Sequence, residues 1–190
     1  CWLFILGVAE FAVQKVGTFE GKSIQSWVYA KDRDAGFYDF AHITKDVLEF
    51  FSYYVGPFAY EKLANIQSSS VTSGAMETAS AILYAENLIT GQGTERLRNV
   101  MIHEIAHQWF GNSVTEKTWD DAWLSEGFAT YFTMLFQEHQ YGYETYIKEI
   151  KMAKKLIKKY YYQDMNFKVI DDRTAELGPV VTGMTYKKGA

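Results

Sequence analysis

The chain has 190 residues, of which 48% are hydrophobic and 22% charged, so it is long enough and apolar enough to form a globular domain with a buried core. Its formal net charge of -4 gives no electrostatic reason to expect a nucleic acid or an anionic membrane as a partner. The single cysteine, Cys1, excludes an internal disulfide and every cysteine-based zinc pattern. A metal site in this sequence must therefore use histidine and carboxylate ligands.

The apolar run at residues 2–13 is interrupted by Glu10 and has no basic region before it. It is too short and too poorly flanked for a membrane helix or an intact signal peptide. We therefore expect an excerpt from a longer protein, and the sequence assigns neither a compartment nor an oligomeric state.

The first half of the chain predicts strands and one helix. Residues 2–30 contain short apolar or alternating runs broken at glycines and predict two or three strands. After a turn-like segment at residues 31–36, apolar residues with a helical period predict one helix over residues 40–54, ending at Gly56. Residues 63–84 are typical of a strand, a small-residue loop and a second strand.

The second half predicts helices. Thr94 followed by Glu95 indicates a helix start, and apolar residues keep helical spacing from there to Gly111. Further helices are expected over residues 120–140 and 144–162; the lysines of the latter form the solvated face of an amphipathic helix. Strands come first and helices later, without internal repeats, so the expected fold class is α+β rather than a doubly wound sheet.

One segment of the predicted helix carries the H-E-x-x-H pattern, His103-Glu104-Ile105-Ala106-His107. A spacing of four residues places both imidazoles on one helix face, where each nitrogen can reach one zinc ion at about 2.0 to 2.1 Å. Glu104 then projects from the adjoining turn toward a zinc-bound water. The segment alone could arise by chance on an exposed helix.

A catalytic zinc needs a third protein ligand and one position open to water. Glu126 meets this need, since eighteen residues separate it from His107 and it lies near the start of the next predicted helix. An antiparallel helix pair would bring it back beside the two histidines. By itself, Glu126 would more simply be a helix-start carboxylate. Together the three residues predict a His, His, Glu site for one Zn²⁺ per chain.

Four segments in order resemble the signature of the aminopeptidase N and leukotriene hydrolase family of gluzincins. They are GAMET at residues 74–78, HEIAHQWFGN at 103–112, WLSEGFA at 123–129 and YKKGA at 186–190. The sequence departs from the family pattern at Thr78 and Ser125, where asparagine is common. These positions lie beside the functional residues, so they affect fine positioning rather than the class of reaction.

The resemblance implies a zinc-dependent aminopeptidase that hydrolyses the N-terminal peptide bond of peptides through a zinc-activated water. It implies that Glu104 is the general base, that Tyr186 donates to the oxyanion, and that Glu77 binds the free α-amino group of the peptide substrate. The zinc ligands would be His103, His107 and Glu126, and the backbone of Gly74, Ala75 and Met76 would hold the peptide as an added strand.

The resemblance also implies an architecture and leaves alternatives open. Residues 1–30 would be the end of an N-terminal β domain or its junction, and residues 31–190 a thermolysin-like catalytic domain cut off at its C-terminal end. A thermolysin-like endopeptidase, an added epoxide hydrolase activity and a non-catalytic binding module of the same fold remain the alternatives. No sequence feature indicates a nucleic-acid or membrane partner.

Overall fold

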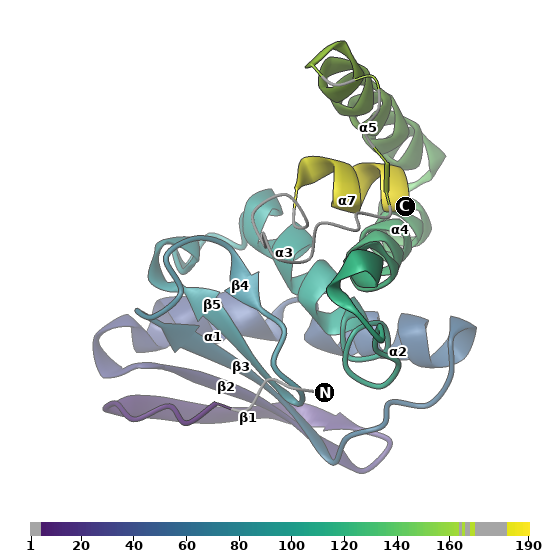
Figure 1. Cartoon of the computed structure of the whole chain (residues 1–190). Helices are drawn as coiled ribbons and strands as arrows, with labels where there is room; N and C mark the ends of the chain where they lie inside the picture. The colour runs from purple at the N-terminus through teal and green to yellow at the C-terminus, as the bar shows by residue number, and fades with distance from the viewer. Residues whose placement is uncertain (1–4, 164, 166–167, 170–181) are drawn as a thin grey trace. The chain divides into compact units, whose positions relative to one another are not determined.

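The computed structural model describes residues 5–163, 165, 168–169 and 182–190 (Figure 1). The chain divides into two compact parts, residues 1–112 and 113–190, which we call the first and the second unit. In the described residues the first unit combines a β-sheet with α-helices, and the second unit is helical. Cys1 lies outside the described residues.

A hairpin begins the sheet of the first unit. Strands β1 (Phe11–Phe19) and β2 (Lys22–Tyr29) pair antiparallel. Glu20 and Gly21, the two residues between them, have φ values of 48° and 79°, the backbone that a two-residue type I′ turn requires. The prediction of two or three strands in this stretch is confirmed, with two strands in the described residues.

Three further strands complete the sheet: β3 (Lys62–Ser68), β4 (Ala75–Met76) and β5 (Ala81–Ala85). Their spatial order is β1-β2-β3-β5-β4, with β2, β3 and β5 parallel and the two outer strands antiparallel (Figure 1). The predicted strand, loop and strand are confirmed, and β4 is an additional short strand within the predicted loop. A domain boundary near residue 30 stays a prediction; β2 hydrogen-bonds directly to β3.

Two helices, α1 (Arg33–Ala41) and α2 (Thr44–Tyr54), follow the hairpin. The prediction of a turn over residues 31–36 is wrong, because Gly36 lies inside α1. A Cβ at Gly36 would come within 2.3 Å of Val28 Cγ1, so the glycine serves close packing of α1 against β2 rather than a turn.

The helix predicted for residues 40–54 is confirmed as α2, which ends at Tyr54 as predicted. Its start is wrong, because residues 40–41 belong to α1 and two non-helical residues, 42–43, separate the two helices. The hydroxyl of Thr44, the first residue of α2, donates to the Phe40 carbonyl at 2.9 Å. This bond ties the new helix to the end of α1. The apolar period continues across the break, which is why the sequence suggested one helix.

The core of the first unit lies between these helices and one face of the sheet. Its largest fully buried side chains include Phe40, Phe51, Leu63, Ile82 and Tyr84. A buried polar chain crosses it: the Tyr84 hydroxyl donates to Asn65 Oδ1 at 3.0 Å, and Asn65 Nδ2 donates to Thr44 Oγ1 at 2.9 Å. Each of these three buried polar side chains thus has a hydrogen-bond partner, as burial requires.

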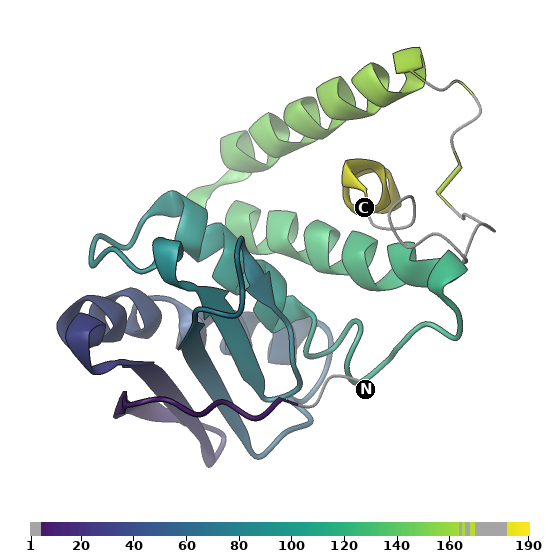
Figure 2. The same cartoon turned by 60° about the vertical axis from the view of Figure 1, so that its left-hand side comes forward.

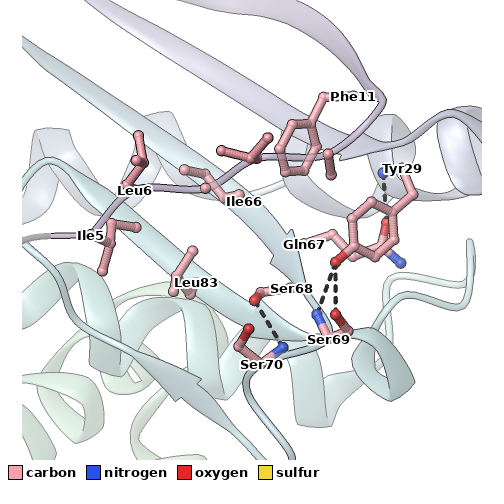
Figure 3. Close-up of a pocket in the computed structure, with 13 residues that line it drawn as sticks. Ile5, Leu6, Phe11, Tyr29, Ile66, Gln67, Ser68, Ser69, Ser70 and Leu83 are labelled. Carbon is pink, nitrogen blue, oxygen red and sulfur yellow. Dashed lines mark hydrogen bonds between the residues drawn. The ribbon is translucent and has the colours of Figure 1, made fainter.

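A pocket of about 430 Å³ lies on the other face of this sheet, beside the segment of residues 5–9 (Figure 3). Half-buried strand residues Tyr29, Ile66 and Leu83 line it, together with a short serine run at residues 68–70. The Tyr29 hydroxyl accepts from the Ser69 backbone N–H at 2.9 Å. None of the residues that the sequence assigns to a site lines this pocket.

The second unit contains three α-helices in the described residues, preceded by a single 3-10 turn at Trp119–Asp121. The α-helices are α4 (Ala122–Tyr141), α5 (Tyr143–Gln163) and α7 (Gly183–Gly189). The helices predicted over residues 120–140 and 144–162 are confirmed, and α7 is additional. Helix α7 lies beside α4 and α5 (Figure 2). None of the helices in the described ranges has both the length and the hydropathy of a membrane span. The predicted α+β class is confirmed.

Candidate metal centre

Helix α3 (Glu95–Ala106) carries the two histidines and begins where the sequence predicts. Thr94 caps it, its hydroxyl accepting from the Leu97 N–H at 3.3 Å. The apolar side chains at the predicted positions are buried; they are Leu97, Met101, Ile102 and Ile105. The helix ends at Ala106 rather than continuing to Gly111, and turns occupy residues 107–109.

A buried carboxylate fixes the loop before α3. Asp39, on α1, is only 1% exposed. Its two oxygens accept from the backbone N–H groups of Thr90, Gly91 and Gly93, each at 2.8 Å. Because hydrogen bonds to an ionised acceptor are about twice as strong as neutral ones, Asp39 holds the entry to the histidine helix firmly.

The imidazole rings of the two histidines lie side by side within the first unit. Nε2 of His103 and Nε2 of His107 are 3.1 Å apart, and their rings are nearly perpendicular at 89°. Two ligand atoms on a tetrahedral zinc at about 2.05 Å lie about 3.3 Å apart, so this spacing fits one zinc ion.

The tautomer of His107 also suits a metal ligand. Its Nδ1 lies 2.9 Å from the carbonyl oxygen of Phe110, an atom that can only accept. The ring proton therefore sits on Nδ1, and Nε2 keeps its lone pair for a metal. A carbonyl that accepts from Nδ1 orients the imidazole ring and raises the basicity of Nε2 as a metal ligand. His107 is 1% exposed and His103 half-buried.

Glu104 is buried, at 7% exposure, between the two histidines in sequence. Burial of Tyr84, together with the charge of Glu104, raises the pKa of the Tyr84 hydroxyl well above its ordinary value of 10.0. The electrostatic influence of Glu104 thus extends into the polar chain of Tyr84, Asn65 and Thr44.

The GAMET motif lies on the edge strand β4 and the turn after it. Ala75 pairs with Tyr84 and Met76 with Leu83, so β4 has one neighbour, β5, in the described sheet. Gly74 has φ 73°, a backbone that favours glycine. Glu77 follows β4 and is half-buried. Its backbone carbonyl accepts from side-chain amides of Gln108 and Asn112, two residues to which the sequence reading gave no role.

In the second unit, Glu126 on α4 and Tyr186 on α7 are brought together. The Tyr186 hydroxyl donates to Glu126 Oε1 at 3.0 Å, and both side chains are half-buried. A Cβ on Gly127 would lie 2.6 Å from the carbonyl carbon of Gly189, so the two helices touch through backbone atoms at this point. The absence of side chains there is what allows the hydroxyl to reach the carboxylate.

His103, His107 and Glu126 make up a His-His-Glu group with the donor types of a zinc site. The first unit also holds Glu77 and Glu104, and the second holds Tyr186. The roles of the individual residues stay predictions.

Comparisons with known proteins agree with these features. Residues 39–190 match the Peptidase family M1 domain. The chain is 33% identical over 146 residues to glutamyl aminopeptidase of Mus musculus, covering 73% of this chain and 15% of that protein. It is 35% identical over 143 residues to aminopeptidase N of Homo sapiens, covering 70% of this chain and 15% of that protein.

The fold is also that of a solved structure, native yeast LTA4 hydrolase. The TM-score is 0.81 at 16% identity, covering 94% of this chain and 29% of the other. The chain therefore spans about 15% of the length of the curated relatives it matches. On the family match over residues 39–190, this chain belongs to peptidase family M1.

Proposed function

We propose that the protein carrying this chain is a zinc-dependent aminopeptidase that removes single residues from the free N-terminus of peptides. The observation that carries the proposal is the pair of Nε2 atoms 3.1 Å apart on His103 and His107, with the His107 proton directed to Phe110. In a member of family M1, that arrangement is best explained as two ligands of one zinc ion.

Glu126 is proposed as the third ligand. A glutamate beside two histidines leaves one position open, which is the pattern of a catalytic rather than a structural zinc. When bound, zinc supplies a Lewis acid that polarises the peptide carbonyl and lowers the pKa of water. The hydrogen bond from Tyr186 supports this role because it orients the carboxylate of Glu126.

Glu104 is proposed as the general base. It takes a proton from the attacking water and later passes it to the leaving amine, a role that contributes about 10² to 10⁴ in rate. Its place in the chain supports this proposal, since Glu104 directly follows the proposed ligand His103 on α3.

Tyr186 and Glu77 are proposed to act on the substrate. The phenol of Tyr186 turns its one O–H from Glu126 to the oxyanion of the tetrahedral intermediate. The carboxylate of Glu77 pairs with the substrate's α-ammonium group, which limits cleavage to the first peptide bond. The edge position of β4 supports a further proposal, that the backbone of Gly74, Ala75 and Met76 holds the peptide as an added strand.

The test uses the full-length protein with aminoacyl-aminomethylcoumarin substrates and their N-acetylated forms. We expect hydrolysis of free substrates only, a loss of about 10² to 10⁴ in kcat for Glu104→Gln with zinc retained, and a raised KM for Glu77→Ala. Glu95→Gln is the matched control, because Glu95 lies on the same helix and is exposed.

Three results would contradict the proposal. Cleavage of blocked peptides at internal bonds would favour an endopeptidase. Zinc binding without hydrolysis of any peptide would favour a binding module. Full activity in Glu104→Gln would exclude that residue as the base.

A further inference from the structure

Gln108, the residue after the second histidine, connects α3 to the loop that carries Glu77. Its side chain is 1% exposed. Its Oε1 accepts from the Ser80 backbone N–H at 2.8 Å, and its Nε2 donates to the carbonyls of Glu77 at 3.3 Å and Glu104 at 3.4 Å. Both ends of the amide therefore contact this loop, and one of them also contacts the histidine helix.

Asn112 reaches the same carbonyl from the end of the HEIAHQWFGN segment. Its Nδ2 donates to the Glu77 carbonyl at 2.6 Å, and its backbone N–H donates to the His107 carbonyl at 3.0 Å. Asn112 is 7% exposed. The Glu77 carbonyl thus receives two side-chain amides, from residues 31 and 35 positions away in the sequence.

The turn after Glu77 is fixed as well. The Thr78 hydroxyl donates to the Ala81 carbonyl, and the Ala81 N–H donates back to the Thr78 carbonyl at 3.1 Å. Ser80, with φ 62°, completes the turn, and Lys62 Nζ donates to its carbonyl at 3.3 Å. With the turn closed in this way, the amides of Gln108 and Asn112 hold a stiff piece of backbone rather than a loose loop.

We propose that Gln108 and Asn112, here called the amide clamp, are positioning residues that set where the Glu77 carboxylate stands relative to the histidine helix, and that they thereby give the site its preference for a free N-terminal ammonium group. The inference rests on the proposed function, because it gives Glu77 the role of pairing with that group.

The physical argument is one of geometry. The Glu77 carbonyl carbon is bonded to the Glu77 Cα and lies in the peptide plane shared with Thr78. Fixing the carbonyl therefore fixes the position of the Cα and limits where the carboxylate can reach. A charge pair between carboxylate and ammonium is worth most at one distance, and misplacement by about 1 Å is enough to lose much of it. The clamp residues belong to the same segment as the histidines. The clamp therefore links the proposed zinc ligands to Glu77, the proposed partner of the substrate's ammonium group.

A pair of ligands tests this directly. Leucine hydroxamate carries a zinc-binding group and an α-amino group, whereas 4-methylpentanohydroxamic acid is the same molecule without the amino group. Isothermal titration calorimetry on the zinc-loaded full-length protein gives the affinity ratio of the two. That ratio reports the ammonium contact alone, because every other contact cancels.

We expect the wild type to prefer the amino ligand and Gln108→Met to lose about five- to tenfold of that preference, with the affinity for the des-amino ligand and the zinc content unchanged. Glu77→Ala gives the ratio with the contact removed. Gln67→Met is the matched control: Gln67 is another glutamine at 1% exposure, bonded to the Tyr29 N–H and to Asp32 Oδ2, and it should keep the wild-type ratio.

Equal loss of both affinities in Gln108→Met, or an unchanged ratio, would overturn the clamp while leaving the aminopeptidase proposal in place. A wild type without preference for the amino ligand would contradict both. If Gln108→Met does not fold, Asn112→Ala carries the same test, since it removes the shorter of the two bonds to the Glu77 carbonyl.

Discussion

The two units hold their site residues in different ways. In the first unit, buried polar side chains bond to backbone groups: Asp39 holds the loop before the histidine helix, and Gln108 holds the loop with Glu77. In the second unit, Gly127 and Gly189 let two helices touch through their backbones, and this brings Tyr186 to Glu126. In the first unit, specific polar groups set the positions of the site residues. In the second unit, two glycines that have no Cβ do so by letting the helices approach closely.

The largest effect on stability is expected in the first unit, from Asp39→Ala. The substitution leaves three buried backbone N–H groups without their carboxylate and should lower the free energy of unfolding by about 3 kcal/mol. Urea denaturation measures this. Asp34→Ala is the control, because Asp34 lies on the same helix with its side chain 95% exposed and should cost less than about 0.5 kcal/mol. Equal costs would refute the anchoring role of Asp39.

In the second unit the corresponding change is Gly127→Ala. The added methyl group would lie 2.6 Å from the Gly189 carbonyl carbon and must push α4 and α7 apart. We expect a cost of about 2 kcal/mol from overpacking and a fall in kcat of about tenfold or more, because Tyr186 moves away from Glu126. Gly17→Ala, with no atom within 4 Å of the added carbon, is the control. Normal stability and kcat in Gly127→Ala would contradict the close approach.

A smaller effect is expected from Tyr84→Phe, which removes the hydrogen bond to Asn65 and should cost about 1 kcal/mol at pH 8. Burial, then the charge of Glu104, raises the pKa of Tyr84 in the folded state, so its neutral form is favoured there. The stabilisation is complete below the unfolded pKa near 10.0 and is lost as the pH rises through the folded value.

The gap in stability between wild type and Tyr84→Phe should therefore shrink above about pH 10. Denaturation at pH 8 and at pH 10.5 measures it. Tyr53→Phe is the control, because Tyr53 is 81% exposed. A gap that widens with pH would show that the sign of the pKa shift is wrong.

Local features of the sequence were enough to predict the parts of the site that depend on local geometry. The spacing of His103 and His107 needs only one helical turn. Thr94 caps that helix through a hydrogen bond to a residue only three positions away. For the same reason the predicted start of the helix with Glu126, residue 120, lies within two residues of the observed start at Ala122. Periodicity and capping act over a few residues, so a single sequence contains them.

Features that depend on distant contacts could not be predicted. Gly36 looked like a turn signal because nothing nearby in sequence reveals Val28 against it. Asp39 accepts from a backbone N–H 54 positions away and Gln108 from one 28 positions away, and no local pattern distinguishes them from ordinary polar residues. Helix α7, Gly183–Gly189, is too short for its apolar period to be recognised.

The central proposal is that Glu126 is the third ligand of a zinc ion that His103 and His107 also bind. Zinc content and affinity of the full-length protein, measured by mass spectrometry and chelator competition, test it most directly. We predict one zinc per chain in the wild type and in Glu138→Ala, a change on the same helix, and an affinity lower by at least about a hundredfold in Glu126→Ala. Wild-type zinc affinity in Glu126→Ala would contradict the claim.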